Sequence, residues 1–232
     1  AVHCEDEEII QKNIKDAKEK FGDNIPINMH PEIRNTEACY KSSSLAVNLA
    51  KKHNTRLHVF HLSTEKEIEL FDNTIPLKDK KITAEVCVHH LWFSEEDYAQ
   101  KGTLIKWNPA IKKVSDREAL WKALNEDKID VLATDHAPHT LEEKSGVYPS
   151  TPSGTPGVQT LLPVMLDHAA NGKLSYERIV DLMAYGPKKV HKIKNKCAIT
   201  EGYDADFSIV DPNLIHKITN EEQASKSGWT PY

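Results

Sequence analysis

The feature that most constrains the fold is a repeated alternation between short apolar runs and longer segments whose apolar residues have helical spacing. Apolar β-rich runs cover 56–62, 82–88 and 129–134, and helical spacing marks 7–22, 35–54, 64–72 and 115–126. Strands that alternate with helices favour parallel β/α units, because each helix returns the chain to the edge where the next strand begins. The alternation therefore predicts an α/β protein, and its spacing suits a (β/α)8 barrel as well as an open sheet.

Capping residues indicate where several of these helices begin and end. Gly22 follows the first helical segment as a C-cap, and Asn35 precedes the second as an N-cap. Ser115 is the expected N-cap of the fourth segment. Two more helices are predicted at 158–171 and 175–186.

Two stretches break the alternation. Residues 138–163 are rich in Gly, Pro, Ser and Thr, which predicts a long functional loop. Residues 201–211 (EGYDADFSIVD) are typical of a turn that leads into one strand of a small β-domain. We therefore expect a domain boundary near residue 196, with 1–196 forming the larger domain and 197–232 belonging to the smaller one.

Composition limits the partners and the compartment. The formal net charge is -5, no basic block stands out, and no apolar run approaches the ~18 residues needed to span a bilayer. We therefore expect neither nucleic acid nor a membrane as a partner. The four cysteines lie far apart without a C-x-x-C pair, which favours reduced thiols in a cytoplasmic protein.

Three potential metal ligands stand where predicted strands end. His3 ends the first strand, His61 the second and Asp135 the fourth, at sequence separations of 58 and 74 residues. In a parallel barrel the carboxyl ends of all strands lie on one face, so these side chains can converge. Imidazole and carboxylate ligands suit Zn²⁺, Mn²⁺ or Fe²⁺. Each residue also has a structural alternative, since a strand-end histidine is often hydrogen-bonded structure and such an aspartate is often a helix N-cap.

Several motifs resemble those of dihydroorotases. Residues 134–139 (TDHAPH), followed by 142–144 (EEK), are similar to the T-D-H-A-P-H…E-K signature of that family. The family's N-P-P-L-R block, its two single-histidine strands and its G-x-D-A-D turn have counterparts in 108–112 (NPAIK), 2–6 (VHCED), 56–64 (RLHVFHLST) and 202–206 (GYDAD). The resemblance covers essentially the whole chain, in order.

The resemblance implies a fold and a site. The fold is the C-terminal half of a (β/α)8 TIM barrel of the metal-dependent hydrolase type, with strands 5 to 8 in 1–196, plus part of a small composite β-sandwich domain in 197–232. His3 and His61 would bind the more buried of two zinc ions, and Asp135 would bind the other and act as general acid/base. Asn108 and His139 would bind the substrate.

The implied activity is hydrolysis of a cyclic amide, the reversible interconversion of dihydroorotate and N-carbamoyl-aspartate in de novo pyrimidine biosynthesis. The partner would be this small-molecule substrate, in a possible homo-oligomer. Two alternatives stay open: an allantoinase or dihydropyrimidinase-like cyclic amidohydrolase, and a non-catalytic dihydroorotase-like scaffold domain. Asn108 and His139 favour the dihydroorotase, because a substrate carboxylate needs polar partners at those positions.

The sequence departs from the family pattern at its start. The family's H-x-H pair, the carboxylated lysine that bridges its metals and a substrate-binding arginine have no counterpart, and they would lie upstream of residue 1. The chain begins at Ala1 without Met or signal peptide and stops in a loop at Tyr232. We expect both ends to be cuts in a longer chain, and the chain alone to be inactive.

The remaining histidines are expected to be structural. His30 and Arg34 match a family pattern at a helix start, where a carbonyl or carboxylate partner would explain them. His58 is expected to pack toward a helix, on the opposite side of its strand from His61. His89 and its neighbour at position 90 should end the third strand and point to opposite faces, so that both cannot face one metal.

Overall fold

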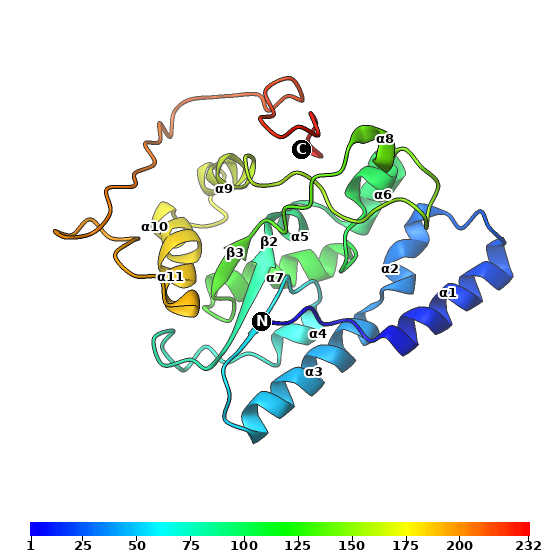
Figure 1. The fold of residues 1–232 in the computed structure, drawn as a ribbon, viewed down its shortest axis with the longest axis horizontal. Coiled ribbons are helices and arrows are strands. Elements are labelled where there is room, and N and C mark those ends of the chain that lie inside the picture. The colour runs from blue at the N-terminus through cyan, green and yellow to red at the C-terminus, as the bar shows by residue number, and fades with distance from the viewer.

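The computed structural model describes residues 1–232, whose centre is a small parallel sheet (Figure 1). Its strands β1 (Leu57–Val59), β2 (Ile82–Cys87) and β3 (Val131–Ala133) lie in the order β1-β2-β3, and both pairings are parallel. The first predicted strand contributes one parallel bridge, from Val2 to Val59. Four strand segments therefore lie side by side in chain order, as the β/α alternation predicts.

The first long helices begin and end where their capping residues indicate. Helix α1 (Glu7–Phe21) starts after Asp6, whose carboxylate accepts the backbone N–H of Ile9, and ends at Gly22. Helix α3 (Thr36–Lys52) starts after Asn35, whose side chain accepts the backbone N–H of Ala38. Local hydrogen bonds within four residues fix these boundaries.

The expected cap of α7 (Val114–Asn125) is wrong. The helix begins one residue before Ser115, so Ser115 lies inside its first turn. The carboxylate of Asp116 takes the capping role instead, because it accepts the backbone N–H groups of Lys113 at 3.3 Å and Glu65 at 2.9 Å. The start of α7 is therefore capped by Asp116, which also binds the distant backbone of Glu65, and not by Ser115.

The other helices are mostly short. They are η1 (Ile27–Met29), α2 (His30–Ile33), α4 (Glu65–Ile68), α5 (Val88–Trp92), η2 (Glu95–Asp97), α6 (Tyr98–Lys101), η3 (Gly102–Ile105), α8 (Leu141–Lys144), α9 (Leu161–Ala170), α10 (Tyr176–Val180), the π-helical η4 (Asp181–Tyr185) and α11 (Gly186–His191). The predicted loop at 138–163 is confirmed apart from the single turn of α8 and the start of α9. No helix combines the length and apolar character that crossing a membrane requires.

The main core lies between one face of the sheet and the helices that cover it. Alternate strand residues contribute to this face, while the intervening residues point to the other side. The buried members from the strands and from α3, α4 and α7 include Val59, Ala84, Val86, Leu132, Val47, Ile68, Leu120 and Leu124. The four cysteines are free thiols, as expected, and all except Cys197 are buried.

Residues 197–232 contain no helix or strand, so the strand predicted within 201–211 is not formed in this structure. The apolar side chains of Phe207 and Ile209 are 64% and 98% exposed. A strand is stable only when a neighbouring strand pairs with it, and no such neighbour lies beside this segment. The chain then returns to the body of the protein, where the indole of buried Trp229 donates to the carbonyl oxygen of His139 (Figure 1).

Candidate metal centre

Two histidines that are distant in the sequence meet at the carboxyl ends of neighbouring strand segments. Nδ1 of His3 lies 3.1 Å from Nε2 of His61, and the ring centroids are 4.8 Å apart. The parallel bridge between Val2 and Val59 sets this meeting, because each histidine follows closely after its bridge residue. At His61 the backbone φ of 36° leaves the strand conformation and turns the ring toward His3.

The separation of these two nitrogens fits a shared metal ion. Zinc binds histidine nitrogens at ~2.0–2.1 Å in tetrahedral geometry, so two such nitrogens lie about 3.3 Å apart. The observed 3.1 Å is close to that separation. Nδ1 of His61, which is the ring nitrogen that does not face His3, Oε1 of Glu5 and Oδ1 of Asn108 are buried without a hydrogen-bond partner. The two imidazole donors and the separation of their nitrogens both fit a divalent cation.

A buried ion pair holds the outer side of the His3 ring. Oε2 of Glu5 lies 2.9 Å from Nε2 of His3, and the same oxygen accepts from the guanidinium of Arg34. Burial alone would raise the pKa of Glu5, but the hydrogen bond with His3 and the charge of Arg34 outweigh it and hold that pKa below its ordinary value. Glu5 is therefore an ionised carboxylate at neutral pH.

His61 is held in the form that binds metals. Burial, followed by the proximity of His3, lowers the pKa of His61, although the charges of Asp135 and Glu85 oppose this shift. A neutral imidazole at neutral pH retains the nitrogen lone pair that a ligand needs. The sequence reasoning identified this histidine but gave no indication of its protonation.

Asp135 is not in contact with the two histidines. It follows β3, its φ is 45°, and it forms no hydrogen bond or ion pair in the structure. No group of three or more histidine, cysteine, aspartate or glutamate side chains is arranged to hold a metal ion. The sheet order explains this, since β2 lies between β1 and β3 and separates their ends by about 9–10 Å at ~4.8 Å per strand. The ligand role of Asp135 stays a prediction.

The two predicted substrate-binding residues lie in separate loops. Asn108 is partly buried before Pro109, and His139 is partly exposed with Nδ1 3.5 Å from a carboxylate oxygen of Glu143. No hydrogen bond joins Asn108 to His139, or either residue to His3. Their proposed roles are therefore also still predictions.

A buried lysine that sequence reasoning left without a role anchors the loop after β3. The ammonium of Lys144 is fully buried and donates to the carbonyl oxygens of Lys106, Pro152 and Gly154 at 3.3, 3.0 and 3.0 Å. Burial, and next the charge of Lys106, lower the pKa of Lys144 to about 7. Only its position in the motif at 142–144 could have drawn attention to it.

A second lysine holds the same loop from the other side. Lys106 donates to the carbonyl oxygens of Pro149, at 2.8 Å, and Thr151. Burial lowers the pKa of Lys106 to about 8, with a smaller effect from the charge of Arg34. The loop continues to Thr155, which pairs with His136 directly after Asp135. Two buried cations thus fix the segment that lies beside Asp135.

The expected carbonyl and carboxylate partners of His30 and Arg34 are confirmed. His30 is buried, with Nε2 2.6 Å from the carbonyl oxygen of Trp107 and Nδ1 3.2 Å from the hydroxyl of Tyr148, and burial lowers its pKa to about 3. Arg34 pairs with Glu5, as the expectation of a carboxylate partner required. His30 is held by carbonyl and hydroxyl groups, whereas Arg34 is connected to the candidate metal centre through that carboxylate.

His58 contacts a helix, as expected, because its ring lies edge-on to that of His191, the last residue of α11, with centroids 5.6 Å apart. It is also hydrogen-bonded to the hydroxyl of Thr83 at 2.9 Å and to the carboxylate of Glu85 at 3.0 Å. Val59, its neighbour in β1, belongs to the main core.

The two adjacent histidines after β2 are not in a strand. His89 and His90 belong to helix α5, so the argument from strand alternation does not apply to them. The ring of His89 stacks on Trp107 with centroids 4.1 Å apart, and Nε2 of His90 lies 3.2 Å from the carbonyl oxygen of Pro109. Both rings are buried, and burial lowers their pKa values.

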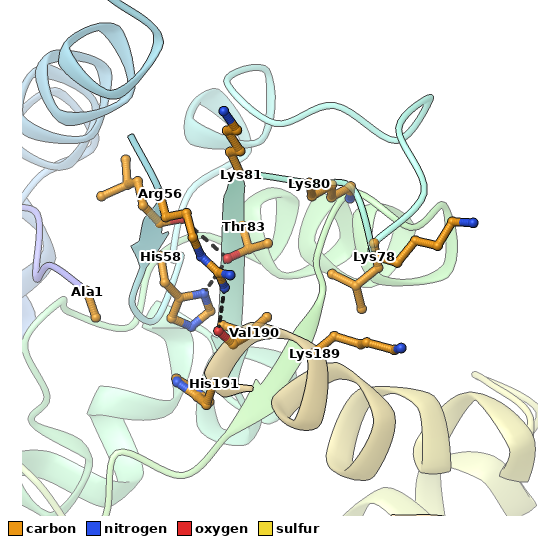
Figure 2. A pocket seen from close by; sticks show the side chains of 12 residues that line it. Ala1, Arg56, His58, Lys78, Lys80, Lys81, Thr83, Lys189, Val190 and His191 are labelled. Carbon is orange, nitrogen blue, oxygen red and sulfur yellow. Dashed lines mark hydrogen bonds between the residues drawn. The ribbon is translucent and has the colours of Figure 1, made fainter. Parts of the chain in front are cut away.

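A hollow of about 180 Å³ lies at the opposite, amino ends of β1 and β2 (Figure 2). Arg56 and several lysines line it, but in Figure 2 the side chain of Lys81 extends upward, whereas those of Lys78 and Lys189 extend to the right. The ammonium of Lys80 is already paired with Asp130 at 2.7 Å. These cations do not converge on one point, and His3 and His61 lie at the other end of the sheet.

Comparison with known proteins gives consistent matches along the chain. The profile of the amidohydrolase family matches residues 1–230. The dihydroorotase of Pyrococcus furiosus is 36% identical over 232 residues, which is 100% of this chain and 49% of that protein. The dihydroorotase of Halobacterium salinarum is 37% identical over 199 residues, covering 86% of this chain and 46% of that protein.

A solved structure matches the fold closely. The L-hydantoinase (dihydropyrimidinase) from Arthrobacter aurescens superposes with a TM-score of 0.87 at 28% identity, over 95% of this chain and 49% of that one. The chain therefore spans about half the length of the relatives that it matches.

Proposed function

Because this chain belongs to the amidohydrolase family, we propose that it carries one half of the active site of a dihydroorotase. The proposed reaction is the reversible hydrolysis of dihydroorotate to N-carbamoyl-aspartate in pyrimidine biosynthesis. The observation that carries the proposal is the pairing of His3 and His61 at 3.1 Å, in a chain whose curated relatives are named dihydroorotase. The motif at 134–139 supports the same substrate class.

The proposed fold is the C-terminal half of a (β/α)8 barrel. Its support is the chain-order array of parallel strand segments from Val2 to β3, together with the match to half of a hydantoinase chain. We also propose that 197–232 belongs to a composite β-sandwich. The uncovered apolar side chains of Phe207 and Ile209 support this, since a partner strand would cover them.

His3 and His61 are proposed to hold a divalent metal ion such as zinc, and Asp135 to approach a second one. When bound, such ions polarise the amide carbonyl and lower the pKa of a water molecule. Residues 1–232 contain no H-x-H pair, so a complete two-metal centre needs ligands from outside this range. The neutral imidazole of His61 and the carboxylate-bound His3 both have the form that such a centre requires.

Asp135 is proposed to move the proton. As water adds to the amide carbon, its carboxylate accepts the released proton and delivers it to the ring nitrogen when the C–N bond breaks. The carboxylate is suited to this task because it is exposed and has no partner that would compete for the proton. Asn108 and His139 are proposed to bind the substrate carboxylate, which would draw their two loops together.

The match to an L-hydantoinase supports a second candidate, a hydantoinase-type cyclic amidohydrolase. Both candidates use the same chemistry on a ring amide. They differ in whether the substrate carries a carboxylate, as dihydroorotate does and hydantoin does not. The substrate test should therefore compare dihydroorotate, N-carbamoyl-aspartate, hydantoin, dihydrouracil and allantoin as substrates of the purified product of the full reading frame. Turnover of dihydroorotate and its reverse supports the proposal, whereas turnover of hydantoin, dihydrouracil or allantoin without dihydroorotate contradicts it.

A further inference from the structure

A continuous set of side-chain contacts leads from a helix end to the paired histidines. The guanidinium of Arg34 donates to Oε2 of Glu5, and the same oxygen lies 2.9 Å from Nε2 of His3. The opposite ring nitrogen of His3, Nδ1, lies 3.1 Å from Nε2 of His61. Glu5 therefore contacts the outer side of His3, away from the place where a metal would be shared, and Arg34 is linked to His3 only through Glu5.

The exposed fractions of the three side chains indicate which of them is fixed in place. The side chain of Glu5 is 2% exposed and that of Arg34 is 21% exposed, whereas the side chain of His3 is 44% exposed. Packing alone therefore does not fix the ring of His3. The buried carboxylate is the contact that can hold its orientation, since a rotated ring would lose that hydrogen bond.

The backbone around both positioning groups is well anchored. Glu5 precedes Asp6, which caps α1 and donates its backbone N–H to the carbonyl oxygen of Ala38 at 2.9 Å. Arg34 ends α2, and its backbone N–H donates to the carbonyl oxygen of His30 at 2.9 Å. Each charged group thus extends from a fixed helix terminus, which limits how far the carboxylate can move when His3 binds a ligand.

We propose that Glu5 and Arg34 are positioning residues for the metal ligand His3, an inference that rests on the proposed metal centre. Glu5 accepts the Nε2–H of His3, which leaves the lone pair of Nδ1 directed toward His61. Arg34 holds the carboxylate of Glu5 in the orientation that this requires. Removing either residue should weaken metal binding without removing any ligand atom.

The test uses metal-depleted protein expressed from the full reading frame and measures Zn²⁺ affinity by competition with a chromogenic chelator. Glu5→Leu, which preserves size but removes the acceptor, should weaken the affinity by about 10–100-fold, the effect typical of a lost hydrogen bond to a metal-binding histidine. Arg34→Met should weaken it less. Glu5→Gln and Arg34→Lys should restore part of the affinity, because a carbonyl acceptor or a cation remains.

The matched control is Asp130→Asn, which disrupts the buried ion pair with Lys80 at the other end of the sheet. Both side chains of that pair are at most 5% exposed, so its loss should lower the thermal midpoint as the Glu5 variants do. Zinc affinity should stay within about twofold of the wild type in this control. Equal losses of affinity in Asp130→Asn and Glu5→Leu would contradict a positioning role.

A second measurement does not depend on any variant. The ¹⁵N shifts of the His3 ring in the metal-free protein should show the proton on Nε2, and a proton on Nδ1 would contradict the proposal. Zinc affinity that is independent of Glu5, in a protein that turns over dihydroorotate, overturns this inference alone. Zinc affinity that depends on Glu5, in a protein that does not act on dihydroorotate, contradicts the proposed substrate and supports the positioning role of Glu5. A protein that binds no zinc overturns both.

Discussion

The buried ammonium of Lys144 donates to the carbonyl oxygen of Gly154 at 3.0 Å, across the loop that follows β3. With the contacts of Lys144 to Lys106 and Pro152, this hydrogen bond joins both sides of the loop beside Asp135. No carboxylate accompanies the cation, so carbonyl dipoles alone offset its burial. The first two predictions concern the stability of this arrangement.

Lys144→Met should lower the free energy of unfolding by about 3 kcal/mol, because three buried carbonyl groups lose their donor. Urea denaturation followed by fluorescence would measure the change. Lys12→Met is the control, since Lys12 forms only an exposed pair with Asp16. A loss in Lys144→Met no larger than that in the control would show that the loop does not depend on this lysine.

The contribution of Lys144 should also depend on pH. Its pKa in the folded protein is about 7, below the ordinary value of 10.5, so between those values the unfolded chain binds more protons. Stability that derives from Lys144 therefore rises with pH in this window. The difference in unfolding free energy between wild type and Lys144→Met should grow by about 2 kcal/mol from pH 7 to pH 9. A constant difference would mean that the lysine stays protonated.

In the protein expressed from the full reading frame, Asp135→Asn should strongly reduce turnover while the fold survives. The φ of 45° at this position suits asparagine, so the backbone need not change. Loss of the proton carrier should reduce kcat by about 10²–10⁴-fold. Asp127→Asn is a matched control, because Asp127 also has a positive φ of 61° but is paired with Arg178 away from the histidines. Appreciable turnover by Asp135→Asn would remove it as the acid/base.

His61→Ala should lower the zinc content of the purified protein, because Nε2 of His61 is one of the two paired nitrogens. His58→Ala should lower the thermal midpoint through its lost bonds to Thr83 and Glu85 but retain zinc. Atomic emission spectroscopy of both proteins after gel filtration measures the difference. Equal zinc content in the two variants would place the metal elsewhere.

Gly154→Ala should displace the loop beside Asp135. An added Cβ would lie 2.5 Å from the Cβ of Ala137, at a φ of 113° that disfavours side chains. We expect a loss of about 2–3 kcal/mol and reduced turnover. Gly172→Ala, at a φ of 74° with no atom within 4 Å, should lose only about 1 kcal/mol. Thermal melts and initial rates of the two variants would show whether the clash with Ala137, rather than the positive φ alone, causes the loss of stability and turnover.

Structural features that depend on residues close together in the sequence were predicted well. Asn35 indicated the start of α3 and Gly22 the end of α1, because the hydrogen bonds involved span only a few residues. The positions of His3 and His61 at strand ends also predicted their meeting, since parallel strands bring their carboxyl ends to one edge. These features depend on periodicity and on local geometry, which a single sequence contains.

Predictions that depended on a distant partner were wrong or were not made. Ser115 was displaced as a cap by Asp116, whose carboxylate also binds the backbone of Glu65. The strand expected in 201–211 lacks a neighbour. No pattern in the sequence indicated that Lys106 and Lys144 would hold the same loop.

The sequence by itself determined the order of the parallel β/α units, the caps of the first helices and the placing of His3, His61 and Asp135 at strand ends. Only the tertiary structure decided that His3 and His61 touch while Asp135 stands apart, with β2 between their strands. It also decided that Glu5 contacts His3 and that Arg34 contacts Glu5. The physical reason is that caps and periodicity arise between near neighbours, whereas a buried charge is satisfied by whichever distant groups the folded chain brings to it.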